Sequence, residues 1–188
     1  MKTHSARSVG GFTLVEVVTV VVIITTILAV VLTSISQARA NSRDKARQVD
    51  LRSIQLSLEL YKEAYGSYPA AGCSASGWAT PGPVTSGTSC NEYIAGLVPN
   101  FIGSLPLDPK NENDTNRGFY YRSNGTEYKV MVSRSVETLT VSDYDNEFAR
   151  CDVSCSATVC QLSNSGFTNS YAVYHDSDPG GGSGAECW

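Results

Sequence analysis

The sequence predicts an α+β protein in which one long N-terminal helix packs on a small antiparallel sheet. Three patterns in its 188 residues point to this fold class. The first is an apolar run of 22 residues, Val17–Ala38, that contains no charged side chain. The second is an amphipathic pattern of helical period in residues 51–65, and the third is a pair of apolar segments flanking Asn124-Gly125. Together they predict a helix with two different environments, followed by a hairpin.

The apolar run is long enough to cross a membrane. A helix needs about 20 apolar residues to span a hydrocarbon core of about 30 Å. A secretory signal peptide has a shorter apolar core and a cleavage site after it, whereas here the glycine pair Gly10-Gly11 precedes the run. We therefore expect residues 12–35 to form a transmembrane helix segment.

A single carboxylate, Glu16, stands at the start of this segment. A charge in lipid is costly, so it should either reach the headgroups or meet a cation. The stretch Gly11-Phe12-Thr13-Leu14-Val15-Glu16, running into an apolar segment, resembles the processing site of type IV prepilins and type II secretion pseudopilins. The resemblance covers roughly the first third of the chain, and it favours a cation on another molecule.

The resemblance implies a processing step and an assembly step. A prepilin peptidase would cut between Gly11 and Phe12, remove the leader peptide 1–11 and methylate the new N-terminus at Phe12. Glu16 would then pair with the amine of Phe12 on a neighbouring copy. The chain is thus expected to be a structural subunit of a type IV pilus or a pilus-like filament, not an enzyme. Its partners would be other copies, membrane lipid, an assembly platform and its ATPase.

Residues 36–66 are expected to continue the helix as an amphipathic segment. Five apolar side chains recur there at spacings of three and four, which places them on one helical face: Leu51, Ile54, Leu58, Tyr61 and Tyr65. We expect this stripe to pack on the sheet. Gly66 and then Pro69 are typical of a helix end.

The remaining residues, 67–188, are expected to form a globular head with a pilin-like fold. Residues 67–106 are rich in Gly, Pro, Ser and Thr and predict a long loop, with a short helix at 91–98. The run Leu105-Pro106-Leu107-Asp108-Pro109 resembles the step before the sheet in major pseudopilins. Strands are predicted at 119–122, 127–133 and 137–141, with another at 171–174.

All six cysteines lie beyond the apolar run, at Cys73, Cys90, Cys151, Cys155, Cys160 and Cys187. An even count in a loop-rich region predicts disulfides, although six cysteines allow 15 connectivities. We expect Cys73 to pair with Cys90, and Cys187 to bond to the region 151–160. Zinc is the competing interpretation, but the spacing C-x3-C-x4-C lacks the C-x2-C pair typical of zinc sites.

The charge pattern and the cysteines disagree about orientation. Five Lys/Arg in residues 39–52 would by the positive-inside rule place the C-terminal side in the cytoplasm. Disulfides form in oxidising compartments, and the family resemblance also places the head outside. We therefore expect a single-pass protein of the cytoplasmic (inner) membrane with its head outside, which later enters an extracellular or periplasmic filament.

One acidic turn is a candidate calcium site. Asp143, Asp145 and Glu147 concentrate the hard oxygen ligands that calcium prefers. Their spacing does not match an EF-hand loop, and acidic runs usually face water, so a solvated turn is the favoured interpretation. No other cofactor is expected.

Two further function classes remain as alternatives. The head carries six Lys/Arg against 13 Asp/Glu, and this net charge of −7 opposes a DNA-binding competence minor pilin. A single-pass protein that binds a ligand and never polymerises is the other. The two histidines, His4 and His175, have no nucleophile partner in the sequence, so no catalytic constellation is expected.

Overall fold

The structure is a computed structural model that describes residues 11–73, 77–83, 89–90, 92–110, 117–177 and 184–188. The expected leader lies outside the described residues except for Gly11. The chain divides into two compact units after Arg39, four positions beyond the expected end of the transmembrane segment at residue 35. The α+β fold predicted by the sequence is observed, with one long helix and a three-stranded antiparallel sheet.

The long helix α1 spans Leu14–Tyr65. It ends where the sequence predicted, because Gly66 adopts a positive φ of 78° and its N–H donates to the carbonyl of Lys62 at 2.7 Å. A left-handed residue at this position satisfies one of the last helical carbonyls, and glycine adopts it without a Cβ penalty.

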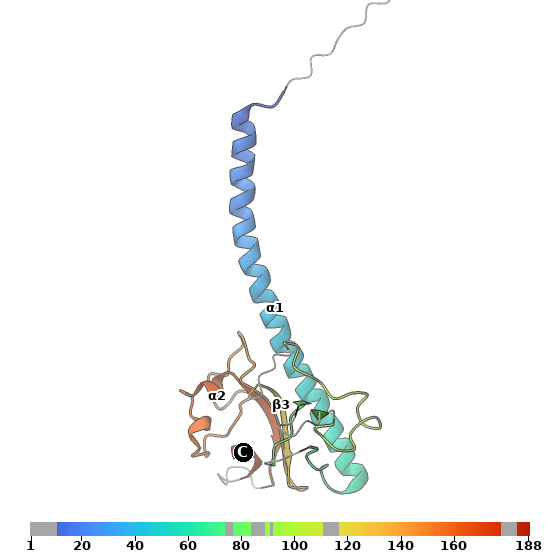
Figure 1. The fold of residues 1–188 in the computed structure, drawn as a ribbon. Coiled ribbons are helices and arrows are strands. Elements are labelled where there is room, and N and C mark those ends of the chain that lie inside the picture. The colour runs from blue at the N-terminus through green and yellow to red at the C-terminus, as the bar shows by residue number, and fades with distance from the viewer. Residues whose placement is uncertain (1–10, 74–76, 84–88, 91, 111–116, 178–183) are drawn as a thin grey trace, which may run out of the picture. The chain divides into compact units, whose positions relative to one another are not determined.

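The main sheet has the order β3-β4-β5, with β3 at Gly118–Ser123, β4 at Tyr128–Ser133 and β5 at Tyr171–His175. The predicted hairpin is confirmed as the β3–β4 pair, but its connection has four residues because Ser123 lies opposite Tyr128. Asn124 accounts for the longer turn, since its side-chain oxygen accepts the N–H groups of Thr126 and Glu127 at 3.0 and 2.8 Å. Figure 1 shows this sheet beside the C-terminal half of α1.

Two predicted elements are wrong. Residues 137–141 do not form the third strand, because the backbone N–H groups of 137–139 donate to the carboxylate of Asp44. The third strand is β5, at the position where an additional strand was predicted. The predicted helix at 91–98 is absent from its described part, 92–98, where Ile94 forms a β-bridge with Ala71.

The other elements are short and lie in loop-rich parts of the chain. Strands β1 (Gly82–Pro83) and β2 (Ser89–Cys90) pair within the predicted loop 67–106. The last elements are the 3-10 turn η1 (Thr158–Cys160), the one-turn helix α2 (Ser165–Thr168) and the 3-10 turn η2 (Ala185–Cys187).

The core lies between the second half of α1 and the sheet. Leu51, Ile54 and Leu58 from the predicted stripe are fully buried in one cluster with sheet residues such as Tyr121 and Val130. Burying a side chain of this size contributes about 1.5–3 kcal/mol. Tyr65, at the end of the stripe, is 62% exposed. The buried part of the apolar face therefore ends before the helix does.

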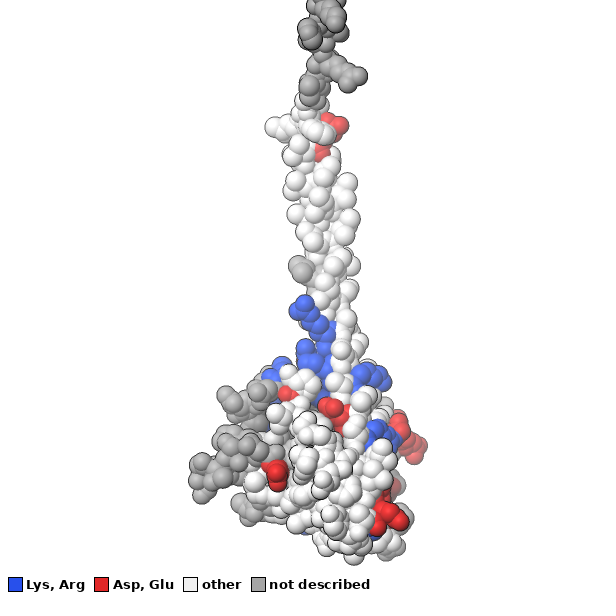
Figure 2. All heavy atoms as spheres, turned by 90° about the vertical axis from the view of Figure 1, so that its right-hand side faces the viewer, with Lys and Arg blue, Asp and Glu red and all other residues white. Residues whose placement is uncertain are grey.

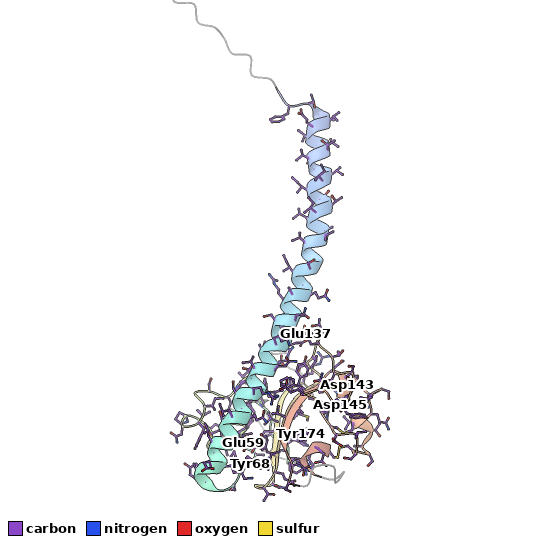
Figure 3. All side chains as sticks on the ribbon, turned by 180° about the vertical axis from the view of Figure 1, so that it is seen from behind. Glu59, Tyr68, Glu137, Asp143, Asp145 and Tyr174 are labelled. Carbon is purple, nitrogen blue, oxygen red and sulfur yellow. A yellow bond between two sulfur atoms is a disulfide. The ribbon has the colours of Figure 1, made fainter. Side chains whose placement is uncertain are left out.

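The end of α1 is also joined to the sheet by polar groups. The hydroxyl of Tyr68 donates to both carboxylate oxygens of Glu59 at 3.1 and 3.0 Å, and the hydroxyl of Tyr128 donates to the same group at 3.2 Å. Glu59 and Tyr68 lie side by side in Figure 3. Burial raises the pKa of both tyrosines well above its usual value, and the Glu59 charge adds to the shift.

A buried arginine, Arg47, joins α1 to two loops. Its guanidinium makes a bidentate pair with Asp108 at 3.0 and 2.8 Å and also contacts Asp44 at 2.8 Å and Glu137 at 3.2 Å. Arg43 makes a second bidentate pair with Glu137, at 2.7 and 2.6 Å. Glu137 is labelled beside α1 in Figure 3. We call these five residues the Arg47 cluster.

The cluster holds its carboxylates in the charged form. The hydrogen bond from Arg43 lowers the pKa of Glu137 to about 2. Burial would raise the pKa of Asp44, but backbone N–H groups of residues 137–139 outweigh it and lower that pKa. Burial likewise opposes the charge of Asp108, and the hydrogen bonds from Arg47 overcome it. Each carboxylate is therefore worth more to the folded state when ionised.

The sulfur atoms form three disulfides, Cys73–Cys90, Cys151–Cys160 and Cys155–Cys187. The first bond and the bond from Cys187 to the region 151–160 were both expected. The last bond joins positions 32 residues apart, and a loop of that length gives a stabilisation of about 3–4 kcal/mol in the chain-entropy account. It fixes the segment around η2 where few apolar side chains are available.

The Arg47 cluster predicts acid sensitivity. Because the pKa of Glu137 falls from its usual 4.5 to about 2, its contribution is complete above pH 4.5 and is lost as the pH falls toward 2. We expect the melting temperature of the full chain in detergent micelles to fall by a few degrees over this range. Glu137→Gln should lower the melting temperature at neutral pH and should reduce its further fall between pH 4.5 and pH 2. Glu92→Gln, at an exposed position, is the control. The prediction is contradicted if the melting temperature falls equally with pH in the parent protein and in both variants.

Candidate processing and assembly site

The predicted cleavage position precedes α1 in an accessible stretch. Gly11, Phe12 and Thr13 are outside the helix, and Phe12 is 87% exposed. No atom beyond its chain neighbours lies within 4 Å of where a Cβ of Gly11 would stand, so this glycine is not required by packing in this structure. The peptide bond between Gly11 and Phe12 therefore lies outside the helix between two exposed residues.

Thr13 and Glu16 form a capping box at the start of α1. The backbone N–H and the hydroxyl of Thr13 donate to Oε2 of Glu16 at 3.1 and 3.0 Å, and the N–H of Glu16 donates to Oγ1 of Thr13 at 3.2 Å. Such reciprocal bonds satisfy two N–H groups that a helix start leaves without partners, and a carboxylate there also favours the positive helix end.

The capping box is a role of Glu16 that the sequence prediction missed. The signal was present as Thr13-Leu14-Val15-Glu16, which fits the pattern of Ser or Thr followed three positions later by Glu. Both Thr13 donors bond to Oε2, and no described residue forms a hydrogen bond with Oε1. The carboxylate thus caps its own helix through one of its two oxygens.

The segment after Glu16 exposes apolar side chains in all directions. Its large side chains, from Val17 to Ile35, are between 42% and 67% exposed wherever they are described. Figure 2 shows this stretch as a white surface between acidic atoms at its start and the basic residues that follow. In length and composition α1 qualifies as a helix that could cross a membrane. Length and composition thus support the expected transmembrane segment.

Four hydroxyl groups described within this segment are satisfied by the helix itself. Thr19 donates to the carbonyl of Glu16, while Thr25, Thr26 and Ser34 donate to carbonyls three or four positions back. A polar group without a partner costs several kcal/mol in hydrocarbon. These local bonds make the hydroxyls compatible with lipid.

A comparison with family models, curated proteins and solved structures finds no match to this chain.

A second apolar stripe lies on the later part of α1, opposite the core. Val49, Leu56 and Leu60 are 64%, 63% and 51% exposed, and a helical step of about 100° places them across the helix from Leu51 and Ile54. Val49 and Leu56 line a shallow groove. We call Val49, Leu56 and Leu60 the outer stripe.

Charged groups border the outer stripe. Arg52 lies over the ring of Phe148, with 4.9 Å between the guanidinium carbon and the ring centroid, and forms an ion pair with Glu147. The groove also includes Lys45. The stripe therefore combines exposed apolar surface with a charged edge.

The candidate calcium residues do not gather into a site in this structure. Asp143 and Asp145 are exposed in one turn, as Figure 3 shows, while Glu147 pairs with Arg52. Within the described ranges, the oxygens of Asp143, Asp145 and Glu147 are not all within 4.8 Å of one another. Calcium binding stays an untested prediction, and the geometry gives it no support.

The capping box can be tested directly. Thr13→Val removes one donor and one acceptor, so the first turn of α1 should lose about 1 kcal/mol of stability. Amide exchange at Glu16, measured by NMR in bicelles, should become about fivefold faster. Thr13→Ser retains the hydroxyl and should exchange like the parent. An unchanged rate in Thr13→Val would show that the cap contributes nothing.

Proposed function

We propose that this chain is a structural subunit of a type IV pilus or a pilus-like filament. The observation that carries the proposal is the position of Glu16. This one carboxylate opens a 22-residue uncharged run and follows an accessible Gly11–Phe12 bond. The three features match what a processed, membrane-inserted filament subunit needs. The chain itself is not an enzyme in this proposal but the substrate of one.

Processing would create the partner that Glu16 needs. Hydrolysis of the Gly11–Phe12 bond by a prepilin peptidase releases the leader and gives Phe12 a cationic amine, which the same enzyme then methylates. Within one copy, Thr13 already donates to Oε2 of Glu16. Oε1 is then the atom available to the amine of Phe12 on a neighbouring copy, and pairing neutralises two charges that lipid disfavours.

The outer stripe supplies a second contact between copies in this proposal. It lies on the same helix as the apolar segment and presents Val49, Leu56 and Leu60 away from the core. Copies anchored in one membrane run parallel, so a neighbour would pack its own α1 against this face. Assembly would also require a platform protein and a cytoplasmic ATPase.

The proposal places the chain in the inner membrane with its head outside, before it enters the filament. Three disulfides support a head in an oxidising compartment. A type II secretion pseudopilin is the second candidate, favoured by the run Leu105–Pro109. In this structure Asp108 of that run pairs with buried Arg47. The net charge of −7 on the head opposes a DNA-binding role.

The first test concerns the mature N-terminus. Mass spectrometry of the protein from cells that contain a prepilin peptidase should find a methylated Phe12 as the first residue. Gly11→Val should block the cut and leave the precursor in the membrane, whereas Gly10→Ala, one position earlier, should be processed. An intact Met1 in the parent protein, or a cut after residue 35, defeats the pilin class as a whole.

The second test concerns charge pairing. Glu16→Gln keeps the size of the side chain and an oxygen that can cap the helix, but it removes the charge. Membrane insertion and processing should be normal, while filament yield should fall at least about tenfold, since an unpaired amine remains in lipid. Glu63→Gln, on the water-exposed part of α1, is the matched control. Normal filament yield from Glu16→Gln would remove the pairing argument.

The third test concerns the outer stripe. Leu56→Ser should change the stability of the folded chain by less than about 0.5 kcal/mol, because the side chain is exposed. Filament yield, measured by electron microscopy of sheared fractions, should fall several-fold. Val153→Ser alters an apolar residue outside α1 that is 71% exposed, against 63% for Leu56, and should assemble normally. Equal yields from the two variants would exclude this face as a contact.

A further inference from the structure

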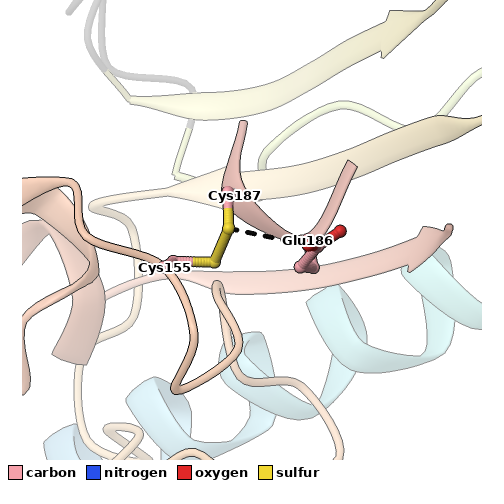
Figure 4. Close-up of side chains that lie close together, drawn as sticks. All are labelled: Cys155, Glu186 and Cys187. Carbon is pink, nitrogen blue, oxygen red and sulfur yellow. Dashed lines mark hydrogen bonds between the residues drawn. A yellow bond between two sulfur atoms is a disulfide. The ribbon is translucent and has the colours of Figure 1, made fainter. Parts of the chain in front are cut away.

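Two cysteines and a glutamate lie together at η2. The sulfur atoms of Cys155 and Cys187 and a carboxylate oxygen of Glu186 are all within 4.8 Å of one another. Figure 4 shows the three side chains converging from η2 and from the loop that contains Cys155. The two sulfur atoms form a disulfide here, so neither is a thiolate and the oxidised trio cannot bind a metal.

Glu186 is the unusual member of the trio. It is only 1% exposed, and its Oε2 has no hydrogen-bond partner within the described chain. Its other oxygen, Oε1, lies 3.7 Å from Sγ of Cys187. A buried polar atom without a partner is destabilising, and a carboxylate more so. The oxidised structure therefore holds a buried carboxylate beside the two sulfurs, and one of its oxygens has no partner in the described chain.

We propose that reduction of the Cys155–Cys187 bond creates a binding site for a thiophilic divalent cation, with zinc the best match. Two thiolates and one carboxylate are a ligand set that zinc accepts in tetrahedral geometry, and water would complete it. This site does not depend on the proposed filament function.

Reduction of the Cys155–Cys187 disulfide requires an external two-electron reductant, such as a thiol or a phosphine. The S–S bond breaks, and the two sulfur atoms take up two electrons and two protons. The reductant is oxidised to a disulfide or, with water, to a phosphine oxide. Metal binding then releases the two thiol protons, because the thiolate is the ligand.

The backbone that carries the ligands is held by contacts other than the disulfide. Lys129 is fully buried, and its amine donates to the backbone oxygens of Glu186 and Trp188, both at 2.9 Å, on either side of Cys187. The N–H of Cys187 donates to Gly184 at 3.0 Å, and that of Cys155 donates to Asp152 at 3.2 Å. These bonds would keep the ligands in place after reduction.

The distances also suit one ion. The Cα atoms of Cys155 and Cys187 are 5.2 Å apart, so rotation of the two side chains lets both sulfurs reach one zinc at about 2.3 Å. Cys187 is only half-buried, which gives the ion a path from solvent. Across the described residues, no other three Cys, His, Asp or Glu side chains come as close.

The test uses the full chain in detergent micelles, with Co²⁺ as a spectroscopic probe and Zn²⁺ as competitor. A phosphine reductant is used, because a dithiol reagent would itself bind metal. The oxidised protein should show no thiolate-to-cobalt charge-transfer band. The reduced protein should show one, and Zn²⁺ should abolish it. Glu186→Gln should weaken Co²⁺ binding by about tenfold or more, whereas the exposed Glu92→Gln should not.

Paired serine variants identify the sulfurs. Cys155→Ser with Cys187→Ser should remove the band, and Cys151→Ser with Cys160→Ser should retain it. Near-ultraviolet circular dichroism of the reduced chain should keep the signal of a folded head. The proposal is overturned by equal binding in Glu186→Gln, by a band that survives loss of Cys155 and Cys187, or by a reduced chain that binds metal only after losing its fold. Filament formation is a separate readout, so failure here leaves the proposed function untouched.

Discussion

The folded head depends on neutralising one buried positive charge. Arg47 is fully buried, and removing a partner from such a charge costs about 3–5 kcal/mol. Its partners come from α1 itself and from two loops, at Asp44, Asp108 and Glu137. Because Asp44 also accepts three backbone N–H groups of residues 137–139, the same ion pairs decide where that loop runs. Charge pairing therefore fixes the position of the loop at residues 137–139, which apolar packing alone would not fix.

The carboxylate at the start of α1, Glu16, is paired differently. Among the described residues no Lys or Arg forms an ion pair with it, and its donors are the N–H and hydroxyl of Thr13. These neutral donors satisfy one oxygen without neutralising the charge. In water, hydration would stabilise the remaining charge of the carboxylate, whereas in lipid the charge would need a cation. In the filament that we propose, the amine of a cleaved neighbouring copy would supply the missing cation.

The side chain of Glu186 is buried without either kind of partner. It lies beside a disulfide, and its Oε2 has no hydrogen-bond partner in the described structure. These sites thus show three states of pairing: the carboxylates of the Arg47 cluster bond to arginine, Glu16 bonds to neutral donors, and Oε2 of Glu186 has no partner in the described chain. The first state bears on the stability of the head, and the other two underlie the proposed assembly contact and the proposed metal site.

The sequence by itself determined the local features of this protein. The uncharged run, the end of α1 at Gly66, the β3–β4 hairpin and the Thr13–Glu16 pattern all depend on residues within a few positions of each other. Tertiary structure decided the rest. Arg47 meets Asp108 and Glu137 across 61 and 90 residues, and the capture of 137–139 by Asp44 turned a predicted strand into a loop. Glu186 meets Cys155 only after folding. Local periodicity and turn chemistry act through neighbouring residues, whereas the pairing of buried charges depends on which distant segments meet.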